Sequence, residues 1–189
     1  EEPENHPALI MCTSGTTGTP KGAMLSEDNI LTNVRDITEY LGIGREDTIL
    51  IARPIYHCAV LTGEFLTSLF KGVNIYFYSG EFHPSRMLEI IKEQKITVLG
   101  GTPTLLGMMA LLKHKMEVNT LRHICISGEC MDRDKGLQIA EAFPESRIYH
   151  VYGLTEAGPR VSYLPPELFQ QYPDCVGIPL RSVSVRIVK

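Results

Sequence analysis

A glycine- and threonine-rich segment near the N-terminal end combines several kinds of anion-binding group. It holds four threonines, a serine, three glycines and a lysine, in the order Thr13-Ser14-Gly15-Thr16-Thr17-Gly18-Thr19-Pro20-Lys21-Gly22. Glycines let successive backbone N–H groups turn toward an anion, and hydroxyls add donors that carry no charge. Lys21 adds the point charge that suits a polyphosphate. We interpret the segment as a phosphate-binding loop rather than a flexible turn. It is not a Walker A loop, because no Gly-Lys-Ser or Gly-Lys-Thr sequence occurs.

A second polar turn, Tyr152-Gly153-Leu154-Thr155-Glu156, follows an apolar stretch that predicts a strand over 147–151. Open α/β sheets bind their ligands beyond the carboxyl ends of the strands, which is where this turn lies. Glu156 offers the carboxylate oxygen that a hard cation bridging phosphates prefers. The alternative is a surface turn with a solvated glutamate.

These two motifs, in this order, resemble those of the adenylate-forming superfamily, which includes acyl-CoA synthetases, luciferases and peptide-synthetase adenylation domains. The resemblance extends over nearly the whole chain. It implies that a carboxylate attacks the α-phosphate of MgATP, giving an acyl-adenylate and pyrophosphate, and that a thiol then takes the acyl group. The implied cofactors are ATP, Mg²⁺ and coenzyme A, or the pantetheine of an acyl carrier protein in place of coenzyme A.

The resemblance also implies roles for individual residues. Tyr152 would stack against the adenine, and Thr155 and Glu156 would lie by the phosphates, with Glu156 holding Mg²⁺. Thr155, Glu156 and His57 are the catalytic candidates. The implied nucleotide-binding residues are Thr13, Ser14, Gly15, Thr16, Thr17, Gly18, Lys21, Gly128, Glu129, Cys130, Tyr152 and Gly153.

Two further motifs resemble family elements less specifically. The turn Ser127-Gly128-Glu129-Cys130 follows another predicted strand and resembles a turn that contacts adenine, although a plain strand-to-helix turn explains it nearly as well. The segment Arg53-Pro54-Ile55-Tyr56-His57 matches the Pro-x-x-His of many acyl- and aryl-CoA ligases, in which the histidine lines the carboxylate pocket. The alternative for His57 is a structural role.

Apolar runs alternate between strand-like and helix-like patterns along the chain. Ser26 is typical of an N-cap, and an apolar face at helical spacing then ends at Gly42. Thr102 and Pro103 open another helix. Such alternation predicts an α/β fold with a mainly parallel sheet and helices on both faces. Strands are expected at 8–12, 48–52, 73–77, 97–99, 123–127 and 147–151, and helices at 59–70, 84–93 and 132–143.

We expect three parts in this organisation. Residues 1–26 form a strand-loop-strand segment around the phosphate loop, and residues 27–160 form the nucleotide- and acyl-binding α/β part. Residues 161–189 begin a β-rich subdomain that is cut short, because Val183, Val185 and Ile187 alternate with polar residues. This tail strand has no visible partner, so we expect self-association through its open edge.

Composition excludes several classes of protein. The 189 residues are 43% hydrophobic, enough for a packed core, and 18 basic against 22 acidic residues give a net charge of −4. That balance disfavours nucleic-acid binding, and no apolar run is long enough to span a membrane. Five cysteines without a Cys-x-x-Cys pair favour reduced thiols and a cytoplasmic location.

The preferred function is that of a fragment of an ATP-dependent fatty or aryl acid ligase. Residues 54–63 contain no acidic side chain to pair with a substrate ammonium, which disfavours an amino-acid-activating domain. A non-catalytic ATP- or AMP-binding module and a purely structural α/β domain are further alternatives. The Thr-Gly-Asp motif that binds ribose in the family is absent, since the nearest match is Thr62-Gly63-Glu64 in a predicted helix. Without it and the family's C-terminal lysine, we expect the isolated chain to be inactive.

Overall fold

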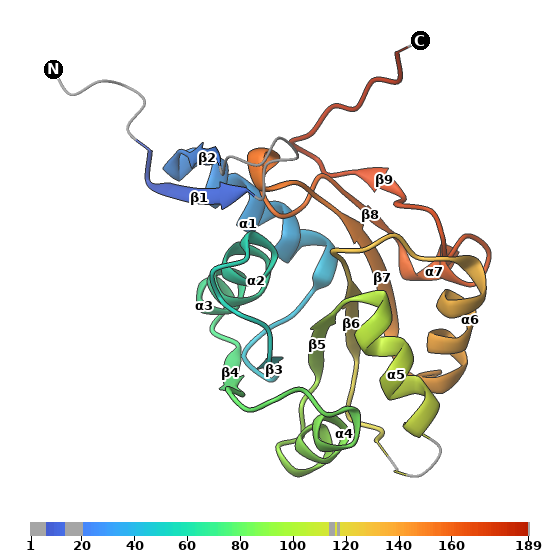
Figure 1. Ribbon diagram of the computed structural model, residues 1–189. Coiled ribbons are helices and arrows are strands. Elements are labelled where there is room, and N and C mark those ends of the chain that lie inside the picture. The colour runs from blue at the N-terminus through green and yellow to red at the C-terminus, as the bar shows by residue number, and fades with distance from the viewer. Residues whose placement is uncertain (1–6, 14–20, 114–115, 117, 189) are drawn as a thin grey trace, which may run out of the picture.

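Figure 1 shows the computed structural model, which describes residues 7–13, 21–113, 116 and 118–188. Seven strands form one sheet in the order β4-β3-β5-β6-β7-β8-β9. The first five pair in parallel, and β8 and β9 are antiparallel to their neighbours. The strands are β3 (Thr48–Ile51), β4 (Asn74–Phe77), β5 (Val98–Gly101), β6 (His123–Ile126), β7 (Arg147–Tyr152), β8 (Ser162–Leu164) and β9 (Ile178–Pro179). The predicted α/β fold with a mainly parallel sheet is confirmed.

Helices cover both faces of this sheet, because each face of the central strands is apolar (Figure 1). One core cluster contains side chains of α4, α5 and α6, and the other contains side chains of α1 and the α2–α3 region. The helical elements are α1 (Glu27–Leu41), α2 (Cys58–Val60), η1 (Leu61–Leu66), α3 (Thr67–Lys71), α4 (Pro84–Glu93), α5 (Pro103–Lys113), α6 (Arg133–Ala142), η2 (Thr155–Ala157) and α7 (Pro166–Phe169).

The helix ends follow the predicted capping residues. The Ser26 side chain accepts a hydrogen bond from the Asn29 N–H, and the Asn29 side chain accepts one from the Ser26 N–H. At the other end of α1, Gly42 takes the left-handed conformation with φ 64°. Thr102 Oγ1 accepts from the Leu105 N–H at the start of α5, as the sequence predicts.

A separate two-stranded sheet precedes α1. Strand β1 (Leu9–Thr13) pairs antiparallel with β2 (Lys21–Leu25), and Thr13 lies opposite Lys21. The predicted phosphate loop joins these two strands. Five of its implied ligands, Ser14, Gly15, Thr16, Thr17 and Gly18, lie outside the described residues.

Three expectations need correction. The single helix expected at 59–70 is divided, because its middle, η1, is a π-helix. Strands β8 and β9 lie between residues 162 and 179, where no individual strand was expected, and they join the same sheet. Residues 183–188 form no strand, because an isolated strand finds no partner for its backbone groups among the described residues. The open strand edge on which the expected self-association rested is therefore not present.

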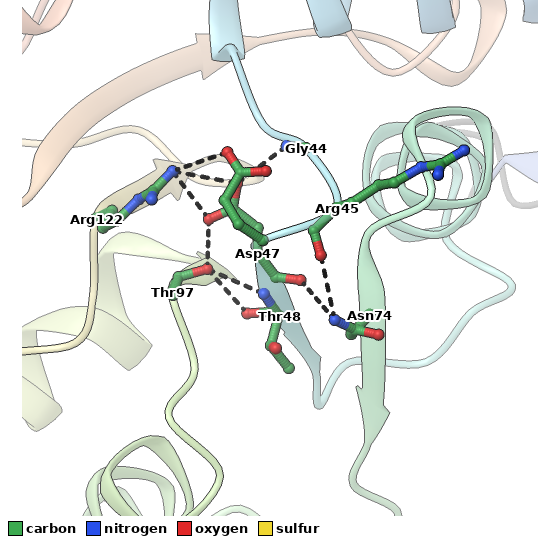
Figure 2. A network of polar contacts seen from close by, with 8 residues as sticks. Gly44, Arg45, Asp47, Thr48, Asn74, Thr97 and Arg122 are labelled. Atoms are coloured by element: carbon green, nitrogen blue, oxygen red, sulfur yellow. Dashed lines mark hydrogen bonds and ion pairs between the residues drawn. The ribbon is translucent and has the colours of Figure 1, made fainter.

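A buried carboxylate joins the amino ends of three strands (Figure 2). Asp47, which directly precedes β3, is fully buried and accepts hydrogen bonds from the Gly44 N–H and from Thr97 Oγ1. Arg122, directly before β6, forms an ion pair with it at 3.2 Å. This network holds β3, β5 and β6 in register at one edge of the sheet and leaves the opposite edge for the loops that carry the candidate site.

Candidate functional site

A cavity of about 360 Å³, here called cavity I, lies at the carboxyl ends of the parallel strands. Its volume falls in the range of small-molecule sites, roughly 300–1,000 Å³. Each of β3, β5, β6 and β7 delivers at least one residue to it. The lining residues are Met11, Cys12, Arg53, Pro54, Tyr56, His57, Cys58, Ala59, Thr102, Ser127, Gly128, Gly153, Thr155 and Pro159.

The strand order explains why a cavity opens here. The chain continues from β3 to β4 on one side, and β5 then returns to the other side of β3. The loops after β3 and β5 therefore diverge, and such switch points are where open α/β sheets bind ligands. Arg53 follows β3 and Thr102 follows β5, and both line cavity I.

A second hollow of about 300 Å³, cavity II, adjoins cavity I. The two share Gly128, which lies after β6, and Gly153, which lies after β7. Three of the residues implied to contact adenine, Glu129, Cys130 and Tyr152, line cavity II. The structure thus brings the turns after β6 and β7, which are distant in the sequence, together at one site with two adjoining cavities.

The backbone conformation and close packing at the two positions shared by the cavities require glycine. Gly128 has φ 93°, a region that side-chain-bearing residues rarely adopt. A Cβ at Gly153 would collide with the carbonyl oxygen of Pro159. Only glycine therefore allows the β7 turn to fold back closely on the segment after η2.

Thr155 and Glu156 form the first two residues of η2, directly after this turn. Thr155 lines cavity I, and its Oγ1 lies 3.6 Å from the Sγ of Cys58 at the start of α2. Glu156 is exposed. An exposed carboxylate beside the cavity is suited to hold a cation together with ligand oxygens. In the described ranges no three or more His, Cys, Asp or Glu side chains cluster to hold a metal ion without a ligand.

His57 lies on the cavity I side of the site. It precedes α2, is exposed, and packs its ring against Tyr56 with 4.6 Å between the centroids. Its side chain does not cap the helix. A structural role as a side-chain cap of α2 is thus excluded, and His57 lies in the wall of cavity I.

Glu129 lines cavity II, but its carboxylate is engaged elsewhere. Oε2 accepts hydrogen bonds from Oγ1 and the backbone N–H of Thr104, at 2.7 and 3.2 Å. The hydroxyl of Thr104 holds the pKa of Glu129 below its usual range. This carboxylate stabilises the first turn of α5, so only the remaining part of Glu129 is available to a ligand in cavity II.

The described ends of the phosphate loop lie beside the site. Met11 and Cys12 of β1 line cavity I, which places the β1–β2 hairpin at its border. Thr13 Oγ1 donates to the Lys21 carbonyl at 3.4 Å, and Lys21 is exposed. Thr13 and Lys21 thus lie opposite each other at the end of the hairpin where the loop begins and ends.

Comparison with known proteins is consistent with this geometry. The family model of the AMP-binding enzymes matches residues 1–189. The chain belongs to this family. The resemblance to adenylate-forming enzymes expected from the motifs is therefore confirmed.

Curated relatives of this AMP-binding chain are CoA ligases. It is 28% identical over 183 residues to a feruloyl-CoA synthase of Amycolatopsis sp., covering 95% of this chain and 36% of the relative. It is 30% identical over 192 residues to a mitochondrial medium-chain acyl-CoA ligase of Rattus norvegicus, covering 96% of this chain and 31% of the relative. The chain thus spans about a third of the length of these relatives.

Solved structures of the family share the fold. The O-succinylbenzoate coenzyme A synthetase from Bacillus subtilis, in complex with ATP and a magnesium ion, superposes with a TM-score of 0.84 at 26% identity. The match covers 97% of this chain and 38% of that structure. The α/β architecture described above is therefore that of an AMP-binding enzyme.

A buried charged cluster in this AMP-binding chain was not predicted from the sequence. Arg53 forms an ion pair with Glu64 of η1, and the side chain of Glu64 is 3% exposed. Arg160, which follows the turn after η2, is 1% exposed. The signal available in the sequence was a set of charges within otherwise apolar stretches, but the distances along the chain gave no indication that they meet.

The tyrosine and cysteine side chains near Arg160, the second arginine of this cluster, supply no negative charge to balance it. Burial raises the pKa of the Tyr40 hydroxyl well above its usual range, and it raises the pKa of the Cys125 thiol to about 11. Both groups are therefore protonated and neutral near pH 7. The cluster of Arg53, Glu64 and Arg160 carries one net positive charge.

No helix of the described residues combines the length and apolar character needed to cross a membrane.

Proposed function

We propose that the protein containing this chain activates a carboxylic acid with ATP and then transfers the acyl group to a thiol. The observation that carries the proposal is the divided site, in which cavities I and II meet at Gly128 and Gly153. An adenylate-forming site needs one compartment for the nucleotide and one for the acid, with the reacting groups at their junction. Cavity II is assigned to the adenosine part and cavity I to the acid.

The first chemical step follows from this assignment. An oxygen of the substrate carboxylate attacks the α-phosphorus of ATP, a new P–O bond forms, and the bond to the bridging oxygen breaks. Pyrophosphate leaves with the electron pair, and the acyl-adenylate remains across the junction of the two cavities. In this proposal Thr155, which lines cavity I, donates a hydrogen bond to a phosphate oxygen, and Lys21 with the loop that it ends neutralises the departing charge.

Glu156 is the residue proposed to hold Mg²⁺. It is exposed, and among the described residues it forms no ion pair, so its carboxylate remains available for a cation that also binds phosphate oxygens. The bound cation would neutralise phosphate charge and orient the triphosphate. We propose Tyr152, which is 42% exposed in the wall of cavity II, as the side chain that stacks on the adenine.

The second step is thioester formation. A thiolate attacks the acyl carbonyl carbon of the adenylate, the acyl–oxygen bond breaks, and AMP leaves. The names of the curated relatives, a feruloyl-CoA synthase and a medium-chain acyl-CoA ligase, support coenzyme A as the thiol. A carrier-protein pantetheine is the alternative acceptor.

The five free thiols of the chain support the further proposal of a reducing, cytoplasmic location.

The acid is proposed to be a fatty or aryl acid rather than an amino acid. The described residues that line cavity I include no aspartate or glutamate. Glu64 lies directly after the segment 54–63, which has no acidic residue, but it is already paired with Arg53. A substrate ammonium would therefore lose its hydration without gaining a counter-charge in this cavity.

The direct test is acid-dependent exchange of labelled pyrophosphate into ATP by the full-length protein. Panels of alkyl, aryl and amino acids should be compared. Exchange that depends on an alkyl or aryl acid supports the proposal. ATP hydrolysis without any acid requirement, or exchange with amino acids alone, would contradict it.

A further inference from the structure

The Arg53–Glu64 ion pair lies between β3, β5 and η1, and its arginine lines cavity I. Arg53 is the second residue after β3, and Glu64 belongs to the π-helical segment that crosses over the sheet. A Cβ at Gly100 of β5 would collide with the Glu64 carboxylate and would lie 3.1 Å from Arg53 Nη2. The ion pair therefore occupies the space that the missing side chain of Gly100 leaves free.

The surroundings of the pair make it electrostatically positive. Arg160 packs against the same π-helical segment, since a Cβ at Gly63 would lie 3.0 Å from its Nη2. Glu64 is the one carboxylate in this cluster of three charged side chains. An electron-rich group that approaches Arg53 is thus attracted by a cluster that holds two arginines and one carboxylate.

Arg53 still has donor capacity toward cavity I. Its Nη2 donates a hydrogen bond to Glu64, whereas a guanidinium has five N–H donors. Its side chain is 14% exposed, and it lines cavity I together with His57 and Thr102. Covering this group with a saturated alkyl chain would remove its water without replacing the lost hydrogen bonds, which is unfavourable.

We propose that Arg53 selects acids whose acyl portion carries an oxygen acceptor, a carbonyl or a second carboxylate, over acids with a plain alkyl chain. The inference rests on the proposed function and adds a specificity residue to it. Glu64 fixes the guanidinium by holding one side of it, and the other side faces the acid.

Three acids of equal chain length test this proposal: valerate, levulinate and glutarate. They differ in having no second acceptor, a ketone and a second carboxylate. In the full-length protein we expect higher kcat/KM in pyrophosphate exchange with levulinate or glutarate than with valerate. Replacing Arg53 alone would leave Glu64 buried and unpaired, which is strongly destabilising. The informative variant is therefore the double substitution Arg53→Met with Glu64→Gln, and Arg181→Met on the surface is the matched control.

The double variant should lose about 10- to 100-fold in kcat/KM for the oxygenated acid, the range expected for a charge-assisted hydrogen bond. Valerate should be unaffected or improved, and the KM for ATP should not change. An equal loss for all three acids would mean that Arg53 binds the reacting carboxylate, and it would overturn the proposal. A wild-type preference for valerate would also overturn it.

A binding measurement separates this inference from the proposed function. If no acid supports exchange, the proposed function fails. Thermal unfolding then decides the inference by itself. Stabilisation by glutarate but not by valerate, lost in the double variant and kept in Arg181→Met, supports the assignment of Arg53. Equal effects of the two acids on the wild-type protein contradict it.

Discussion

The Thr97 hydroxyl donates a 2.6 Å hydrogen bond to Oδ1 of Asp47, a carboxylate that is fully buried where β3 begins. The same hydroxyl accepts from the Thr48 N–H at 3.0 Å (Figure 2). The Thr97 side chain, directly before β5, thus forms hydrogen bonds with both the buried carboxylate and the first backbone N–H of β3. This contact stabilises the sheet at the edge opposite the cavities.

Replacing Thr97 by valine keeps the shape of the side chain but removes its hydroxyl. We expect a loss of about 1–3 kcal/mol in the free energy of unfolding, because a buried carboxylate and a backbone N–H each lose a partner. Urea denaturation measures the change. The control is Thr38→Val, whose hydroxyl donates to the Arg35 carbonyl on the exposed face of α1 and should cost much less. Equal effects of the two substitutions would contradict the assigned role.

Gly153→Ala should damage both stability and nucleotide binding. The new methyl group meets the Pro159 carbonyl, so the turn between the two cavities must move, at a cost of roughly 1–3 kcal/mol. Thermal unfolding and ATP titration measure the two effects. Gly107→Ala in α5 is the matched control, because its Cβ would meet the Lys135 side chain at an ordinary 3.6 Å. That substitution should be neutral or stabilising.

Lys21→Ala tests the proposed phosphate loop. Loss of the charge at the end of the loop should lower the adenylation rate by on the order of a hundredfold, the effect of removing a preorganised electrostatic contact. Circular dichroism should be unchanged, because Lys21 is exposed in β2. Lys92→Ala at the end of α4 serves as the surface control. Normal adenylation by the Lys21 variant would remove the loop lysine from the mechanism.

Glu156→Gln tests the proposed metal role. The substitution preserves the shape but removes the charge, so activity should fall and the Mg²⁺ concentration needed for half-maximal rate should rise. Titration of Mg²⁺ at saturating ATP measures this shift. The surface substitution Glu141→Gln in α6 should leave it unchanged. A reduced rate with an unaltered Mg²⁺ requirement would argue against metal binding by Glu156.

His57→Ala should change the choice of acid more than the affinity for ATP. The imidazole lies in the wall of cavity I and is absent from the lining of cavity II. The ratio of kcat/KM between an aryl and an alkyl acid is the appropriate measure, with the KM for ATP determined in parallel. His83→Ala, at the start of α4, is the control. Weaker ATP binding with an unchanged acid preference would reverse the assignment of cavities I and II.

The sequence by itself determined the local structure and the family. Apolar periodicity predicted the parallel strands, because buried strands and amphipathic helices require it, and Ser26, Gly42 and Thr102 marked helix ends through local hydrogen bonds. The motifs around Lys21 and Tyr152 indicated an adenylate-forming enzyme. Each of these signals depends on a few neighbouring residues, so it can be recognised in the amino-acid sequence.

Only the tertiary structure decided which distant residues share a site. The meeting of Arg53, Glu64 and Arg160 depends on the π-helical segment packing onto the sheet, and no pattern in the sequence specifies such a contact. The same holds for Glu129, whose carboxylate accepts hydrogen bonds from Thr104 at the start of α5. Short strands such as β8 and β9 also escaped prediction. Their pairing with β7 comes from sheet hydrogen bonds formed across the fold, whereas the strongly alternating residues 183–188 find no such partner among the described residues and form no strand.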